Sequence, residues 1–148
     1  MRNSANPCGV INAYNSVILN TSTTASKKIW MRWLSVFIRE KNNSCYTCLG
    51  DEPYNPLCRG FVEGSDWLLC EAFCLYSQRD RFKPYEKHHS TVREACQLAQ
   101  ELEIPHLVLW HTEDENYSQR KTLYMEEGRG YYNGDLHVPY DLEVIDLV

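Results

Sequence analysis

Hydrophobic and polar residues first fall into a regular pattern near Trp33. Leu34, Val36 and Ile38 recur at every second position, which is the period of a β-strand. The polar run 41–44 predicts a turn, and the apolar run 45–49 predicts the partner strand of a hairpin. The residues before this pattern are polar and show no sustained period. We therefore expect two regions, a poorly specified N-terminal segment over 1–32 and a folded domain over 33–148.

Further along the chain, two nearly continuous apolar runs, 66–73 and 107–110, have the length of strands that are buried on both faces. Between them, Thr91 and Glu94 form a capping-box pattern, and the apolar residues that follow recur at helical spacing to about Glu103.

After the second run, residues 117–127 predict another helix that is stopped at Gly128-Arg129-Gly130, and 136–139 and 142–145 predict short extended segments. Alternating strands and helices predict an α/β fold, in which functional side chains gather where the strands end.

Composition excludes some classes of function but does not identify one. The 148 residues suffice for one domain with a core, and the net charge of -5 argues against a protein built to bind nucleic acid broadly. No apolar run is long enough to span a membrane, and the N-terminus lacks the pattern of a signal peptide. The seven cysteines are an odd number and show no secreted framework. We expect a cytoplasmic protein that does not enter a membrane.

Four side chains are candidates for chemistry. Asp51 follows a predicted strand through Gly50, and His111 ends another strand. Glu71 places a carboxylate inside an apolar run, where an unpaired charge is costly. His89 precedes a helix N-terminus, a position that favours an anion such as phosphate.

Each candidate also has a purely structural interpretation. Asp51 can serve as a turn former, His111 as a surface residue, and Glu71 as the partner of Arg79 or Arg93. The spacing Cys45-x-x-Cys48, with Cys58, also permits a cysteine-rich zinc protein, although buried structural thiols explain these residues better.

Taken together, four short motifs in order resemble the C-terminal half of metallo-β-lactamase-fold hydrolases, in particular the ribonuclease Z-like branch. These motifs are Leu49-Gly50-Asp51, the strand Leu69 to Phe73 containing Glu71, His89-Ser90-Thr91, and the strand Leu107 to His111. The resemblance implies an α/β fold that is half of an αββα sandwich, a mixed sheet with helices on one face.

The resemblance also implies roles for the four side chains. Asp51 would bridge two metal ions, usually zinc, and His111 would bind one of them. Glu71 and His89 would form a hydrogen-bonded catalytic pair in which His89 protonates the leaving oxygen. Two ions at such a centre activate water and neutralise charge on a phosphodiester.

The sequence departs from the family where the first half of the metal site should be. Its five histidines are 88, 89, 106, 111 and 137, and none forms the signature His-x-His-x-Asp-His. Thr112-Glu113-Asp114 follows His111 and argues against tRNA 3′-end processing. Whether the chain is an enzyme is therefore open.

We expect a truncated hydrolase of phosphodiester or ester bonds, with weak or absent zinc binding and little activity alone. Its partner would be a complementing N-terminal half or a second copy, and nucleic acid would enter only as substrate. The alternative is a non-catalytic interaction module that dimerises through its half sheet.

Overall fold

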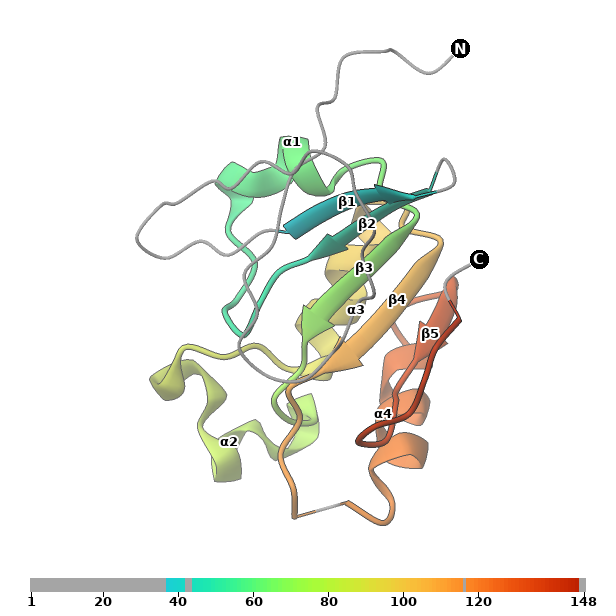
Figure 1. Ribbon diagram of the computed structural model, residues 1–148. Helices are drawn as coiled ribbons and strands as arrows, with labels where there is room; N and C mark the ends of the chain where they lie inside the picture. The colour runs from blue at the N-terminus through green and yellow to red at the C-terminus, as the bar shows by residue number, and fades with distance from the viewer. Residues whose placement is uncertain (1–36, 42–43, 116, 147–148) are drawn as a thin grey trace.

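A five-stranded sheet forms the centre of the computed structural model, which describes residues 37–41, 44–115 and 117–146. The strands lie in the order β1-β2-β3-β4-β5, which is also their order in the chain (Figure 1). β1 and β2 form an antiparallel hairpin, in which Lys41 pairs with Ser44, and β2 to β5 are parallel. The strands are Phe37–Lys41, Ser44–Cys48, Trp67–Glu71, His106–Trp110 and Asp135–His137.

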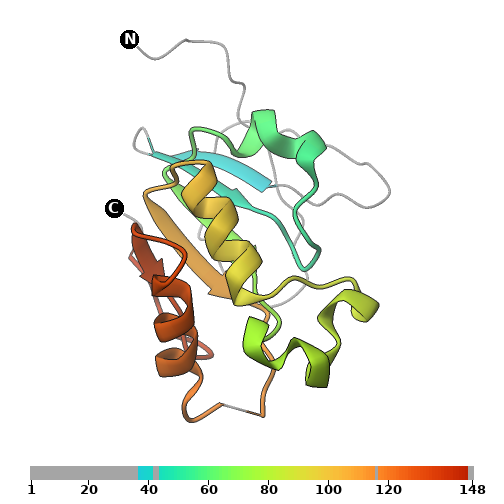
Figure 2. The same cartoon turned by 180° about the vertical axis from the view of Figure 1, so that it is seen from behind.

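Helices α3 and α4 cover one face of this sheet, as the view from behind shows (Figure 2). The helical segments are Pro56–Cys58 (η1), Arg59–Val62 (α1), Tyr76–Gln78 (η2), Arg79–Phe82 (α2), Pro84–Lys87 (η3), Val92–Glu101 (α3) and Arg120–Arg129 (α4). The predicted α/β class and the mixed sheet with helices on one face are confirmed. Among the described residues, no helix has the length and apolar character that crossing a membrane requires.

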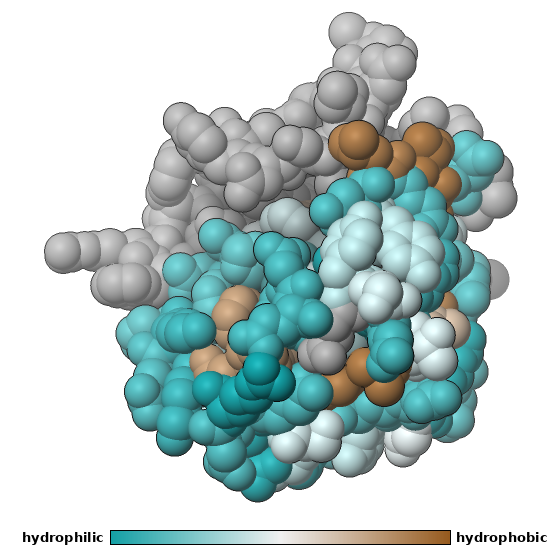
Figure 3. All heavy atoms as spheres, turned by 90° about the horizontal axis from the view of Figure 1, so that it is seen from below, coloured by the Kyte–Doolittle hydropathy of each residue, from teal (hydrophilic) through white to brown (hydrophobic). Residues whose placement is uncertain are grey.

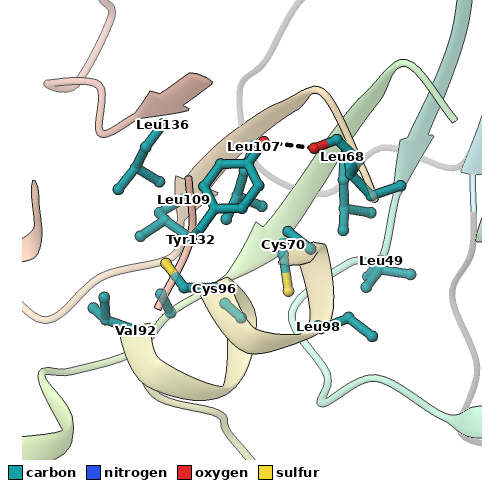
Figure 4. Close-up of a cluster of buried hydrophobic side chains, with 14 of the residues drawn as sticks. Leu49, Leu68, Cys70, Val92, Cys96, Leu98, Leu107, Leu109, Tyr132 and Leu136 are labelled. Atoms are coloured by element: carbon teal, nitrogen blue, oxygen red, sulfur yellow. Dashed lines mark hydrogen bonds between the residues drawn. The ribbon is translucent and has the colours of Figure 1, made fainter. Parts of the chain in front are cut away.

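The main core lies between the sheet and helices α3 and α4, and Figure 4 shows the part of it between the strands and α3. Alternate residues of the central strands, such as Leu68 and Leu107, are fully buried in it. Tyr132 is also buried there, and its hydroxyl donates a hydrogen bond to the carbonyl of Ile104 over 2.7 Å. This bond satisfies the polar end of a large side chain in an apolar layer. A second, smaller cluster contains Tyr46, Trp67 and Val108, which occupy the alternate strand positions whose side chains point to the other face of the sheet.

Several predicted elements have different bounds in the structure. The apolar run 66–73 forms a strand only from Trp67 to Glu71, after which Phe73 leaves the sheet. The second helix begins at Arg120 rather than Tyr117, continues through Gly128 and ends at Arg129, within the predicted stop. Gly128 is retained inside the helix because it packs tightly: an added Cβ would lie 2.6 Å from Cδ2 of Leu136. Residues 142–145 form no strand.

Candidate functional site

Three of the four candidate side chains come from elements that end at one edge of the sheet. Glu71 is the last residue of β3, His111 directly follows β4, and Asp51 lies in the turn after β2. Because these strands are parallel, their carboxyl ends meet at the same edge, where the arrowheads of β3 and β4 lie in Figure 1. Seen from below, the surface at this end is mostly hydrophilic, with separate apolar patches (Figure 3).

Glu71 is completely buried, and both of its carboxylate oxygens have partners. Oε1 accepts a hydrogen bond from the backbone N–H of Ser90 over 2.6 Å, and Oε2 lies 2.8 Å from Nδ1 of His89. The hydroxyl of Ser90 also donates to the Glu71 carbonyl over 3.1 Å. A buried carboxylate is stable only with such partners. The alternative pairing of Glu71 with Arg79 or Arg93 is therefore wrong.

The segment that carries His89 is fixed against the chain beyond β3. The N–H of Phe73 donates to the carbonyl of Ser90, and the N–H of Val92 donates to the carbonyl of Cys74, each over 3.0 Å. The ring of Phe73 stacks on the imidazole of His89, with 4.9 Å between the ring centres. The geometry therefore places the imidazole beside Glu71 through both backbone and side-chain contacts.

The predicted capping box is confirmed and anchors the same segment to α3. Glu94 accepts hydrogen bonds from both the backbone N–H and the hydroxyl of Thr91, the residue that caps the helix. These bonds replace the intrahelical partners that a helix N-terminus lacks. The helix therefore begins three residues after His89, at Val92, and its start determines where that imidazole lies.

His111 completes a group of three donors with Glu71 and His89. Its imidazole lies 4.9 Å from that of His89, measured between ring centres, and one nitrogen or oxygen of each of the three side chains lies within 4.8 Å of the others. The backbone of His111 is left-handed, with φ of 53°. Residues with side chains adopt this conformation uncommonly, and such backbone strain is concentrated at functional sites.

The pKa values of Glu71 and His111 are shifted in opposite directions. Burial raises the pKa of Glu71 from 4.5 to about 8; the hydrogen bonds from Ser90 oppose this rise, and the charge of Asp51 adds to it. Burial lowers the pKa of His111, the imidazole of His89 lowers it further, and the charge of Asp51 raises it. The desolvated site therefore favours neutral forms of both groups, as burial in a low-dielectric region requires.

Asp51 lies at the rim of the site rather than in the three-donor group. Its side chain is exposed, in a turn where Gly50 has φ of 71°, a value that suits glycine. The turn is close to the site because the N–H of Leu49 donates to the carbonyl of Leu69 in β3 over 2.9 Å. The charge of Asp51 acts on both Glu71 and His111.

These residues fit part of a metal centre. Both oxygens of Glu71 are engaged, so this carboxylate positions His89 and is not a ready ligand. Asp51 and His111 remain as donors from this chain, and a catalytic zinc ion normally needs about three protein ligands. The described residues alone do not complete a two-metal site.

Sequence reasoning missed Ser90 and Phe73 as parts of the site. Ser90 is buried and fixes Glu71 through two hydrogen bonds, and Phe73 supports the imidazole of His89. Phe73 lies only two residues beyond Glu71 and Ser90 directly follows His89. Both residues lie in the motifs that carry the family resemblance, but the sequence assigned no role to either of them.

Comparison with known proteins identifies the fold of this chain. No protein-family model matches the sequence, and no curated protein matches it. Among solved structures, the chain resembles the metallo-β-lactamase fold protein YhfI from Bacillus subtilis, with 16% identity and a TM-score of 0.56 over 81% of this chain. It also resembles the short form of human tRNase Z, with 21% identity and a TM-score of 0.53 over 75% of this chain.

The chain spans 55% of the length of the first of these structures and 41% of the second. The parallel strands and the helices on one face agree with half of that fold. In fold, the chain therefore corresponds to about half of a metallo-β-lactamase-fold protein.

Proposed function

We propose that this chain is the C-terminal half of a metal-dependent hydrolase that cleaves phosphodiester or ester bonds. The observation that carries the proposal is the cluster of Glu71, His89 and His111 at the carboxyl ends of β3 and β4, with Asp51 at its rim. The fold shared with YhfI and tRNase Z supports the class of reaction.

The four candidate side chains would have different roles. Asp51 and His111 would hold metal, preferably zinc, because imidazole and carboxylate are donors that this ion accepts. The bound metal would polarise the scissile group and activate water. Nδ1 of His89 faces Glu71, so Nε2 is the nitrogen that would carry a proton to the leaving oxygen. Glu71 fixes this orientation and touches no substrate.

A partner is part of the proposal, because the described residues do not complete the metal site. It would be a polypeptide that carries the missing His-x-His-x-Asp-His segment, or a second copy that buries the same sheet face. The assembled enzyme would act in the cytoplasm, and the chain alone would bind zinc weakly at Asp51 and His111 and show little turnover.

Two measurements test the proposal. Calorimetric titration of Zn²⁺ into the isolated chain should show a weak binding event at Asp51 and His111, and this event should be absent from His111→Ala. Hydrolysis of bis(p-nitrophenyl) phosphate and p-nitrophenyl acetate should appear only when the chain is co-expressed with a half that carries His-x-His-x-Asp-His. Submicromolar binding of two zinc ions by the isolated chain would contradict the division into halves, and an inactive co-expressed complex would contradict hydrolysis.

A second candidate function is a non-catalytic interaction module. It would use the sheet face opposite to the α3 and α4 core, where Tyr46, Trp67 and Val108 form a second apolar cluster that is already buried within this chain. Size-exclusion chromatography with light scattering separates the candidates: a dimer without zinc-dependent hydrolysis in any assembly favours the module, and a monomer that gains activity with a complementing half favours the enzyme.

A further inference from the structure

A second group of metal-ligating side chains lies at the opposite end of the sheet. His106 is the first residue of β4, and Asp135 and His137 are the first and last residues of β5. His106 pairs with Asp135 in the parallel register. At a rise of about 3.3 Å per residue, His106 lies roughly 13 Å from the end of its strand, where the first cluster is found.

Both imidazoles of this group converge on one oxygen. Oδ2 of Asp135 lies 3.2 Å from Nδ1 of His106 and 2.8 Å from Nε2 of His137. The three donor atoms all lie within 4.8 Å of one another. Ligands around a tetrahedral zinc ion, with Zn–N of about 2.0–2.1 Å, are about 3.3 Å apart. Small side-chain movements would therefore place one ion between the three atoms.

The surroundings hold the two imidazoles in place and leave the carboxylate open. The indole of Trp67, only 3% exposed, stacks on His106 at 4.2 Å between ring centres with an angle of 11° between the planes. The same indole lies 5.2 Å from the ring of His137. The side chain of Asp135 is 53% exposed, which leaves a path for an ion from solvent. Rigid donors with an open approach are what a metal site requires.

The geometry points to a metal site formed by His106, Asp135 and His137 that binds one divalent transition-metal ion, preferably Zn²⁺. Two imidazoles and one carboxylate form the donor set that this ion prefers, with a fourth position left for water. The ion would link the three-residue edge strand β5 to β4. This site is structural and does not depend on the proposed function.

The test uses the full chain with His111→Ala, which removes the first cluster as a zinc site, and with thiols kept reduced. Calorimetric titration of Zn²⁺ should show one binding event. Asp135→Asn and His137→Ala should each raise its Kd about tenfold or more, since one of three donors is lost. Dissociation constants within twofold of the parent in both variants would overturn the site, as would the absence of any event in the parent.

Two further readouts separate this site from other donors. Ni²⁺ should quench the fluorescence of a Trp110→Phe variant more than that of a Trp67→Phe variant, because Trp67 stacks on a ligand. Quenching that persists in Trp67→Phe would place the ion elsewhere. The thiols of Cys45 and Cys48 supply the rival donors. The double variant Cys45→Ser, Cys48→Ser should keep the binding event, and His137→Ala should weaken it. If the double variant abolishes the event and His137→Ala leaves it intact, the thiols bind the ion and the site is overturned.

Folding controls keep these variants interpretable. In chelator, Asp135→Asn should stay folded with a thermal midpoint near that of the parent, because the amide keeps the shape of the side chain and loses only its charge. Saturating Zn²⁺ should then raise the midpoint of the parent by a few degrees and leave that of Asp135→Asn unchanged. Equal rises in both proteins would overturn the link between β4 and β5.

Discussion

Nδ1 of His89 lies 2.8 Å from Oε2 of Glu71, a carboxylate that is completely buried. The two residues are brought together from different elements, the end of β3 and the segment that leads into α3. This contact fixes the orientation of the imidazole, so the chemistry assigned to His89 depends on a residue that itself faces no solvent.

The first prediction concerns pH and the metal-free protein. The pKa of Glu71 is raised to about 8 in the folded state, against 4.5 ordinarily. The folded protein therefore holds a proton that the unfolded chain releases between these values, and the stability contributed by Glu71 is complete below about 4.5 and is lost as pH rises through about 8. Urea unfolding in chelator should show the wild type losing stability between pH 5 and 8 relative to Glu71→Gln.

The comparison of wild type with Glu71→Gln also controls for the titration of His111. Burial lowers the pKa of His111, which acts in the opposite direction: its contribution is complete above its ordinary value of 6.5 and is lost as pH falls. Since both proteins contain His111, its effect cancels in the difference. Parallel pH profiles for wild type and Glu71→Gln would show that Glu71 is ionised in the folded state.

The second prediction separates proton transfer from metal binding. In the enzyme assembled with a complementing half, His89→Ala should lower turnover about 10²–10⁴-fold, the usual contribution of a general acid, with metal content nearly unchanged. Asp51→Ala should abolish activity and also reduce metal content. Turnover is measured with bis(p-nitrophenyl) phosphate and metal by atomic emission; equal metal loss in both variants would refute the two roles.

The sequence predicted the elements around the site better than their ends. Alternation around Ile38 predicted the hairpin, and Thr91 with Glu94 predicted the start of α3, because both signals are local. The strand before Phe73 is shorter than predicted, because an apolar residue beside a site gives the same sequence pattern as one inside a strand. The end of α4 at Arg129 lies within the predicted stop, but the place of Gly128 inside the helix was not predicted, because the contact with Leu136 that requires glycine there comes from another element.

The site itself was predicted in composition and only partly in geometry. Glu71, His89 and His111 are brought together by the structure, whereas Asp51 lies at the rim. Their roles remain predictions. The group of His106, Asp135 and His137 was not predicted, because parallel register across β4 and β5 joins residues that are far apart in sequence. Part of the first predicted strand, including Leu34 and Val36, lies outside the described residues.

The third prediction concerns the capping box that positions His89. Thr91→Ala removes the hydroxyl that pairs with Glu94 at the start of α3. The free energy of unfolding should fall by about 1 kcal/mol, the usual contribution of such a cap. Thr122→Ala, at an exposed position inside α4, is the matched control and should change stability by less than about 0.5 kcal/mol. Equal effects of the two substitutions in urea unfolding would show that the cap contributes nothing specific.

The fourth prediction tests why α4 continues through a glycine. In Gly128→Ala, the new methyl group would lie 2.6 Å from Cδ2 of Leu136 and 3.0 Å from Sγ of Cys96, both buried. Overpacking of this kind costs about 1–3 kcal/mol, which exceeds the gain of about 1 kcal/mol from the higher helix propensity of alanine. Unfolding should therefore become easier by up to about 2 kcal/mol. Gly60→Ala, with no atom within 4 Å of the added carbon, is the control and should leave stability unchanged or raise it. A Gly128→Ala protein as stable as wild type would mean that Leu136 repacks without cost and that close approach does not explain this glycine.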